Sequence, residues 1–353
     1  MRKEKIFTLK NCYRDDMDVY GFHFGKGEKS ACIVGAMRGN EVQQLYICSQ
    51  LVKALKELEE KGAIVHDNEI LVIPSVNHSS MNIGKRFWAT DNTDINRMFP
   101  GYSEGKTTQR IAGGVFEAIQ GYSYGIQFPS FYIPGDFVPH IRMMETGFQN
   151  PSLANLFGLP YVVIRNRSRS TRQRSNYNWQ IWNTNAFSVY TSATDYIDEA
   201  SARMAVASVL RFLTRMGILR YTSHSGYIAS VLREDDLTNV KNDLPGLYRR
   251  HVDPVRRCIA GMCLRQSLIR LRERSSVRSS HRPTALSFFS HHAPTVMETI
   301  SSDHPSPARI SVFLPLLTKI LTCSCGQKLF LRLYICEKLL YTNNDKRYKA
   351  IVL

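Results

Sequence analysis

The fold is decided at residues 30–60, which read SACIVGAMRGNEVQQLYICSQLVKALKELEE. Residues 30–37 are an uninterrupted apolar run, which predicts a buried strand. From Glu41 to Glu60 apolar residues recur at helical spacing, so we expect an amphipathic helix. The glycine-punctuated loop between the two holds Arg38 and Glu41. In open sheets with parallel strands, ligands collect where a strand ends and its helix begins, so this loop marks a candidate site.

Strands and helices alternate through the first 217 residues. The sequence predicts further strands over 69–76, 124–132, 160–164 and 186–192, and further helices over 109–120 and 197–216. This alternation is typical of an α/β fold, a mostly parallel sheet with helices on both faces. We therefore expect residues 1–217 to form one α/β domain.

The pattern changes after residue 217. Short strand-like runs at 226–237 and 285–294 predict a smaller β domain over 218–299 that is poorly patterned at 256–287; an incomplete domain is the alternative. Residues 300–353 show no pattern that predicts a fold, which is compatible with a disordered tail. Because hydrophobic patterning stops abruptly at 165–174, 256–287 and after Thr299, one hypothesis is that these segments are read out of frame.

Composition restricts the classes of partner. The chain has 353 residues and a net charge of +16, of which residues 216–353 supply 21 basic against 10 acidic residues. Much of this excess is arginine between Arg256 and Arg282, a segment that lacks the interleaved aromatic residues that stack on nucleic-acid bases, so we expect no nucleic-acid partner. No apolar run is long enough to span a bilayer and the start has no signal-peptide pattern, so we expect a cytoplasmic protein without a membrane partner.

Three further motifs accompany the first loop: Gly84-Lys85-Arg86-Phe87, Asp94-Ile95-Asn96-Arg97 and Phe99-Pro100-Gly101. Together with Gly39-Asn40-Glu41 and the order of strands and helices, they resemble the succinylglutamate desuccinylase/aspartoacylase family of the zinc carboxypeptidase-like superfamily. The resemblance implies a zinc-activated water that attacks the amide bond of a small N-acylated amino acid.

The resemblance also implies roles for individual residues. Arg86 would face the oxyanion, and Asn96 with Arg97 would hold the substrate carboxylate, since guanidinium groups bind carboxylates in a bidentate way. Arg142 is a further candidate for carboxylate binding, although a solvent-facing arginine is the alternative. The expected partner is thus a small ligand that carries a carboxylate.

Most of the residues that would bind the zinc ion and activate its water in this family are replaced in this chain. Arg38 stands where the first zinc-binding histidine belongs, and a guanidinium has donors but no lone pair to offer a metal. The second histidine position falls on Pro129, and the general-base glutamate position falls on Tyr190, our candidate for a catalytic role there. Glu41 alone remains of the expected ligands. Zinc is therefore the cofactor implied by resemblance, and this chain could equally have none.

A rebuilt metal site has one candidate set, Glu41 with Asp136 and His140, because two carboxylates and one imidazole can hold a transition metal. The alternative is that Asp136 caps a turn and His140 is an ordinary loop histidine. Three functions stay open: an amide hydrolase of the family, ancestrally zinc-dependent; a non-catalytic carboxylate-binding protein on the same fold; and a metallopeptidase-like hydrolase with the rebuilt metal site. If the chain is an enzyme, it hydrolyses carbon–nitrogen amide bonds.

Overall fold

A computed structural model describes most of the first 240 residues and short segments beyond them. The described residues are 1–12, 15–131, 135–166, 172–191, 194–240, 246–250, 254, 257–258, 263–268, 276–280, 285–291, 295–296 and 310–313. Within these ranges no helix is both long and apolar enough to cross a membrane.

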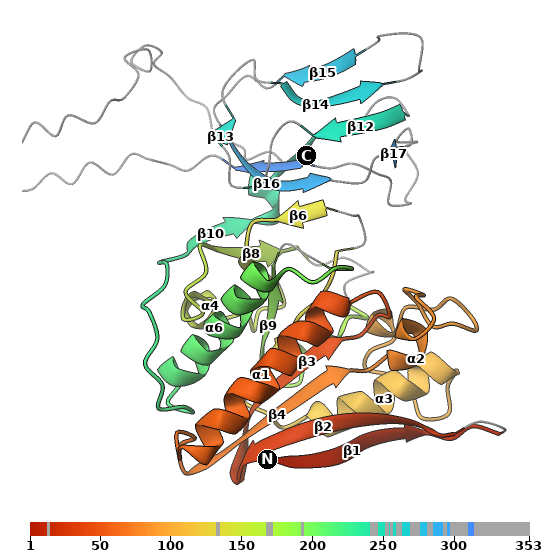
Figure 1. The fold of residues 1–353 in the computed structure, drawn as a ribbon, viewed down its shortest axis with the longest axis vertical. Coiled ribbons are helices and arrows are strands. Elements are labelled where there is room, and N and C mark those ends of the chain that lie inside the picture. Colours follow the sequence, from red (N-terminus) through yellow and green to blue (C-terminus); the bar gives the residue numbers. More distant parts are fainter. Residues whose placement is uncertain are drawn as a thin grey trace, which may run out of the picture.

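A nine-stranded sheet forms the centre of the molecule (Figure 1). In spatial order its strands are β1 (Arg2–Leu9), β2 (Met17–Gly25), β4 (Asp67–Ser75), β3 (Gly27–Ala36), β5 (Tyr124–Gln127), β9 (Asn185–Tyr190), β7 (His140–Met144), β8 (Tyr161–Arg165) and β10 (Ser230–Arg233). The pairs β1–β2, β2–β4 and β7–β9 are antiparallel, and the other neighbours are parallel. The prediction of a mostly parallel sheet is confirmed.

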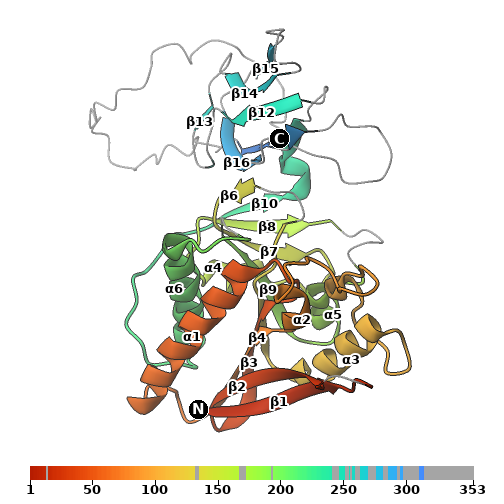
Figure 2. The same cartoon turned by 45° about the vertical axis from the view of Figure 1, so that its right-hand side comes forward.

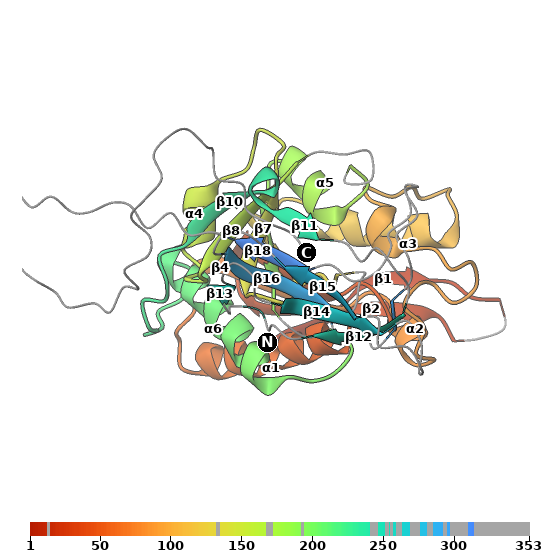
Figure 3. The ribbon, with the colours of Figure 1, turned by 90° about the horizontal axis from the view of Figure 1, so that it is seen from above.

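Helices cover both faces of this sheet, as the alternating pattern predicts. They are α1 (Val42–Glu60), α2 (His78–Met81), α3 (Thr107–Ile119), α4 (Pro151–Asn155), α5 (Ser175–Ile181) and α6 (Glu199–Arg215), with 3-10 turns η1 (Ile95–Arg97) and η3 (Glu234–Asp236). Seen from above, α1 and α6 lie on one side of the sheet and α3 and α5 on the other (Figure 3).

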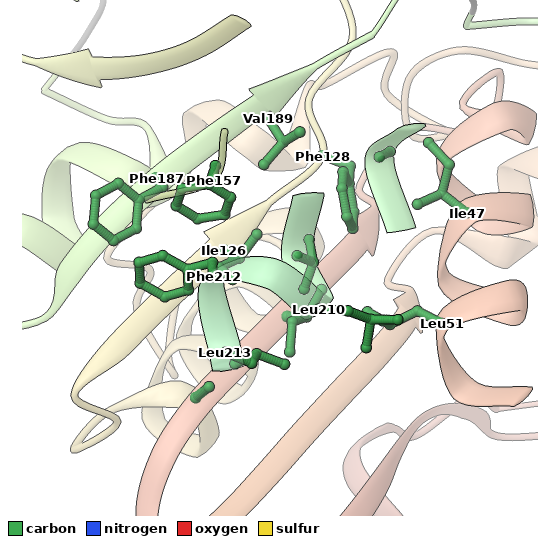
Figure 4. Close-up of a cluster of buried hydrophobic side chains, with 14 of the residues drawn as sticks. Ile47, Leu51, Ile126, Phe128, Phe157, Phe187, Val189, Leu210, Phe212 and Leu213 are labelled. Atoms are coloured by element: carbon green, nitrogen blue, oxygen red, sulfur yellow. The ribbon is translucent and has the colours of Figure 1, made fainter. Parts of the chain in front are cut away.

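Each face has its own hydrophobic core. On the side of α1 and α6, Leu51 of α1 and Phe212 of α6 share a hydrophobic cluster with two side chains from the sheet. These are Phe187 of β9 and Phe128, which directly follows β5 (Figure 4). On the other side, helix α3 buries residues such as Ile111, and the Trp179 indole of α5 is fully buried. Because the strands between the cores are buried on both faces, they are continuous apolar runs rather than alternating ones.

Two smaller sheets lie beyond one end of the main sheet (Figure 2). Their strands are β6 (Gly135–Phe137), β11 (Thr238–Val240), β12 (Gly246–Arg250), β13 (Arg257–Cys258), β14 (Cys263–Leu268), β15 (Ser276–Ser280), β16 (Ala285–His291), β17 (Thr295–Val296) and β18 (Ile310–Phe313). Strand β6 pairs with β16, so a segment of the α/β domain joins the smaller sheet. The expected smaller C-terminal β region is present, and most of the tail at 300–353 lies outside the described residues.

The main sheet is larger than the sequence indicates. Strand β10 lies past residue 217, yet it pairs in parallel with β8, because Leu232 fills a buried position there while its neighbours stay exposed. Residues 140–144, for which the sequence predicted no strand, form the interior strand β7, whose residues are all buried. The N-terminal hairpin β1–β2 was also not predicted, since charged residues occupy the first half of its edge strand.

Candidate anion-binding site

The loop at residues 37–41 leaves the carboxyl end of β3, and Ser130 follows the carboxyl end of the neighbouring strand β5. This is the edge of the sheet at which the sequence predicts a site. Gly39 permits the loop to lie against residues 80–86, because a Cβ atom there would lie 2.2 Å from the carbonyl oxygen of Lys85. The Gly39 N–H donates to the Arg86 carbonyl at 2.9 Å, which ties the two segments together.

Arg38 is buried between two carboxylates. Its Nη2 lies 2.8 Å from Asp94 Oδ2, its Nε lies 3.1 Å from both Asp94 oxygens, and its Nη1 lies 2.9 Å from Glu41 Oε1. Burial by itself lowers the pKa of this guanidinium, but Asp94 and Glu41 together raise the pKa above its usual value. Arg38 therefore carries a permanent positive charge inside the protein.

Glu41 lies directly before helix α1, and both oxygens of its carboxylate accept hydrogen bonds. Its Oε2 accepts from the backbone N–H groups of Met37 at 2.7 Å and Arg38 at 3.0 Å. Its Oε1 accepts from Arg38, from the Ser130 N–H at 3.3 Å and from the Ser130 hydroxyl. The carboxylate is 1% exposed, so it is a structural partner of these donors.

Arg86 lies beside this cluster without a carboxylate of its own in the described part of the chain. Its Nη2 donates to the Phe131 carbonyl at 3.2 Å, and its Nη1 is 3.4 Å from Asn40 Oδ1. Burial and the neighbouring charge of Arg38 lower the pKa of Arg86 to about 10, so it remains charged at neutral pH. Arg86 thus contacts the loop before helix α1, and its role toward a reacting carbonyl stays a prediction.

Asn96 and Arg97 lie in the 3-10 turn η1, whose start is capped by Asp94. Asn96 is 5% exposed, whereas the Arg97 side chain is 45% exposed and its Nε lies 3.5 Å from Asp94 Oδ2. Both side chains line the same cavity as Arg38 and Arg86. The structure thus brings together the residues expected to hold a carboxylate.

Tyr190, at the end of β9, also lines this cavity. Its ring stacks on the His140 ring, with centroids 4.9 Å apart, and the Arg142 guanidinium lies 4.4 Å from the Tyr190 ring centre. Arg142 is buried and is not among the cavity residues, and burial lowers its pKa. Arg142 is therefore not solvent-facing and packs on an aromatic ring, and its carboxylate-binding role stays a prediction.

The structure does not gather Glu41, Asp136 and His140 into a metal site. In the described residues no group of three His, Cys, Asp or Glu side chains is arranged to hold a metal ion. His140 is fully buried, its Nδ1 contacts the Val138 carbonyl at 2.7 Å, and burial followed by the charge of Arg142 lowers its pKa well below 6.5. Asp136 lies on β6, in the strand pair with β16.

The cavity itself has a volume of about 40 Å³, and its walls are strongly basic. Five arginines line it: Arg38, Arg86, Arg97, Arg165 and Arg174. The sequence did not indicate the last two, because the order of residues does not show that β8 and the start of α5 face the loop. Burial and then Arg165 lower the pKa of Arg174 to about 10.

The residues present do not fit a zinc ion. A catalytic zinc site needs three lone-pair donors and one open position. Here Glu41 is saturated by five donors, Arg38 brings a positive charge to the same place, and Pro129 has no side-chain donor atom. We therefore derive no chemistry through a metal.

Comparison with known proteins finds the same family that the sequence motifs resemble. Residues 28–184 match the sequence model of the succinylglutamate desuccinylase/aspartoacylase catalytic domain. A succinylglutamate desuccinylase from a Silicibacter species has a similar fold, with a TM-score of 0.72 at 17% identity over 88% of this chain and 93% of that one. No curated protein sequence matches significantly.

Two other solved structures share the fold. The product-bound ectoine utilization protein EutE (DoeB) from Ruegeria pomeroyi has a TM-score of 0.70 at 17% identity, covering 87% of this chain and 92% of that one. An aspartoacylase family protein from Mesorhizobium loti has a TM-score of 0.70 at 18% identity, covering 89% and 95%. At such identities these likenesses show the fold alone.

Proposed function

Since residues 28–184 match the catalytic-domain model of the succinylglutamate desuccinylase/aspartoacylase family, we propose that this chain is a metal-free binding protein for small dicarboxylates on the family's fold. In this proposal the family's carboxylate-binding residues are kept and its hydrolytic metal centre is replaced by a fixed cation. The ligand is a small molecule rather than a nucleic acid, and the protein acts in the cytoplasm.

The observation that carries the proposal is the position of the Arg38 guanidinium, held by Asp94 and Glu41 at 2.8 Å and 2.9 Å. Bringing a zinc ion to Glu41 would place a divalent cation beside this buried charge. At such separations in a partly buried site, like charges repel by several kcal/mol. The same guanidinium still gives the cavity the positive potential that an anion needs.

The charges around the cavity suggest the charge of the ligand. Three of the five arginines of the cavity wall are neutralised by three carboxylates. Asp94 and Glu41 together neutralise Arg38 and Arg97, and Glu234, 3.5 Å from Arg165, neutralises that arginine. Two positive charges remain among the described residues, and Arg86 and Arg174 have no carboxylate partner there. A dianion would neutralise them, and bidentate guanidinium contacts would orient it.

Hydrolysis is the function that this proposal sets aside. The position of the family's general base holds Tyr190, whose side chain is packed against His140 and Arg142. A phenol hydroxyl donates a hydrogen bond and lacks the carboxylate that a general base at this position uses to activate water.

The test measures metal content, binding and hydrolysis on the purified full-length protein. We expect substoichiometric zinc, binding of succinate or glutarate in calorimetry, and no release of amine from N-acetyl-aspartate. Arg97→Gln should weaken succinate binding at least tenfold, whereas the exposed Arg203→Gln on α6 should not change it. Stoichiometric zinc together with amide hydrolysis that disappears in Glu41→Gln would replace this proposal with the family's enzymatic function.

A further inference from the structure

The Asn96 side chain is held from behind by two residues that the carboxylate-binding proposal has not used. Its Oδ1 lies 3.2 Å from Gln127 Nε2 and 3.0 Å from Ser175 Oγ. The Ser175 hydroxyl also lies 2.7 Å from Gln127 Oε1, so its single proton is shared between the two acceptor oxygens. Gln127 is 2% exposed and lines the cavity together with Asn96, and Ser175 is fully buried, so the three side chains form a small buried hydrogen-bonded cluster.

The orientation of the Gln127 amide is set by a further neighbour. Its Nε2 lies 3.3 Å from Met37 Sδ, a weak acceptor, as well as near Asn96. With the amide reversed, the Gln127 oxygen would face the Met37 sulfur, and both are acceptors. Gln127 therefore presents its donor to Asn96 and its acceptor to Ser175.

This arrangement decides which end of Asn96 meets the cavity. Since its oxygen points back toward Gln127 and Ser175, its Nδ2 group is the end left for the cavity that Asn96 lines. In the described part of the chain no protein acceptor lies within hydrogen-bond distance of Nδ2. A carboxylate oxygen accepts from such a group, whereas a ligand NH2 group would leave two donors facing each other.

We infer that Gln127 and Ser175 are positioning residues that lock the Asn96 amide with its donor toward the ligand, and that this lock makes the site prefer a carboxylate over the corresponding amide. The inference rests on the proposed function for the identity of the ligand. The orientation of Asn96 in the free protein does not depend on it.

The decisive variant is Gln127→Glu, because an ionised carboxylate accepts hydrogen bonds but cannot donate one. Asn96 Nδ2 would then turn toward Glu at 127, and Oδ1 would face the cavity. We expect the affinity ratio of succinate to its monoamide succinamate to fall at least tenfold. Gln127→Met, which removes the lock without adding charge, should lower the ratio by an intermediate amount.

Ser188→Asp is the control for charge. Ser188 also lines the cavity, but its hydroxyl contacts Asn176 and not Asn96. The added negative charge should weaken both ligands, with a smaller change in their ratio than Gln127→Glu causes. An equal change in the ratio, or an unchanged ratio in Gln127→Met, would overturn the inference.

A ligand-free measurement keeps the inference testable if neither ligand binds. The side-chain NH2 signal of Asn96 is assigned in 15N-labelled protein by its loss in Asn96→Ala. In the unchanged protein its protons should exchange with water readily, and in Gln127→Glu they should be protected at least tenfold. The same exchange rate in both proteins refutes the lock, whereas failure of both ligands to bind refutes only the proposed function.

Discussion

Arg38 and Asp94, distant in sequence, meet in a bidentate ion pair in which both Nε and Nη2 of the guanidinium contact the carboxylate. Both side chains are about 9% exposed. The pair joins the loop after β3 to the turn that carries Asn96 and Arg97, so one contact holds the cation and the carboxylate-binding turn in a fixed relation.

Replacing Arg38 with Met should destabilise the protein strongly. It would leave Asp94 and Glu41 buried without their cation, and breaking a buried ion pair from one side typically costs about 3–5 kcal/mol. The measurement is the free energy of unfolding in urea at neutral pH. Arg203→Met breaks only the exposed pair with Glu199, so it should cost less than about 0.5 kcal/mol. An Arg38→Met loss as small as that of the control would contradict the central role of the pair.

Succinate affinity should be constant at neutral pH and fall in alkaline solution. Burial and neighbouring cations lower the pKa values of Arg86 and Arg174 to about 10. The anion binds the protonated guanidinium, so binding is complete below about pH 10 and is lost as pH rises through that value. Each required proton should cost about tenfold in affinity per pH unit above the pKa. Calorimetry from pH 7 to 11, with circular dichroism to verify the fold, checks this; an unchanged affinity at pH 11 would exclude both arginines.

Stability should fall in mildly acidic solution because of His140. Burial lowers its pKa well below 6.5, so the folded protein keeps it neutral while the unfolded chain takes up a proton below pH 6.5. This stability is fully present above pH 6.5 and is lost as pH falls, by up to about 1.4 kcal/mol per pH unit. His140→Phe, which keeps an aromatic ring against Tyr190, should be less sensitive to pH between 6.5 and 5. His66→Gln, at an exposed position, should behave like the unchanged protein.

The sequence predicted strands β3, β4, β5, β8 and β9, helices α1, α3 and α6 and the loop at 37–41, because apolar periodicity is a local property. It also indicated that Arg38 cannot serve as a metal ligand, since this follows from the chemistry of the side chain alone. Asp94 was quoted only as part of a motif, and its pairing with Arg38 depends on a tertiary contact that spacing does not show.

The remaining cavity residues were missed for the same reason. Arg165 and Arg174 reach the cavity from β8 and from the start of α5, and no local pattern marks them as neighbours of Arg86. His140 was weighed as a metal ligand or as a loop histidine, yet it begins strand β7, whose pairing with β9 is a non-local contact. Strand β10 was assigned to the smaller domain because the pattern changes after residue 217, and its partner β8 is far away in sequence.

A guanidinium attached to the backbone behaves differently from a bound metal ion in one practical respect. Chelators cannot strip it, competing metals cannot displace it, and scarcity of zinc in the surroundings cannot deplete it. The charge that Arg38 places in the pocket is synthesised together with the polypeptide, so every folded copy carries it from the moment of folding.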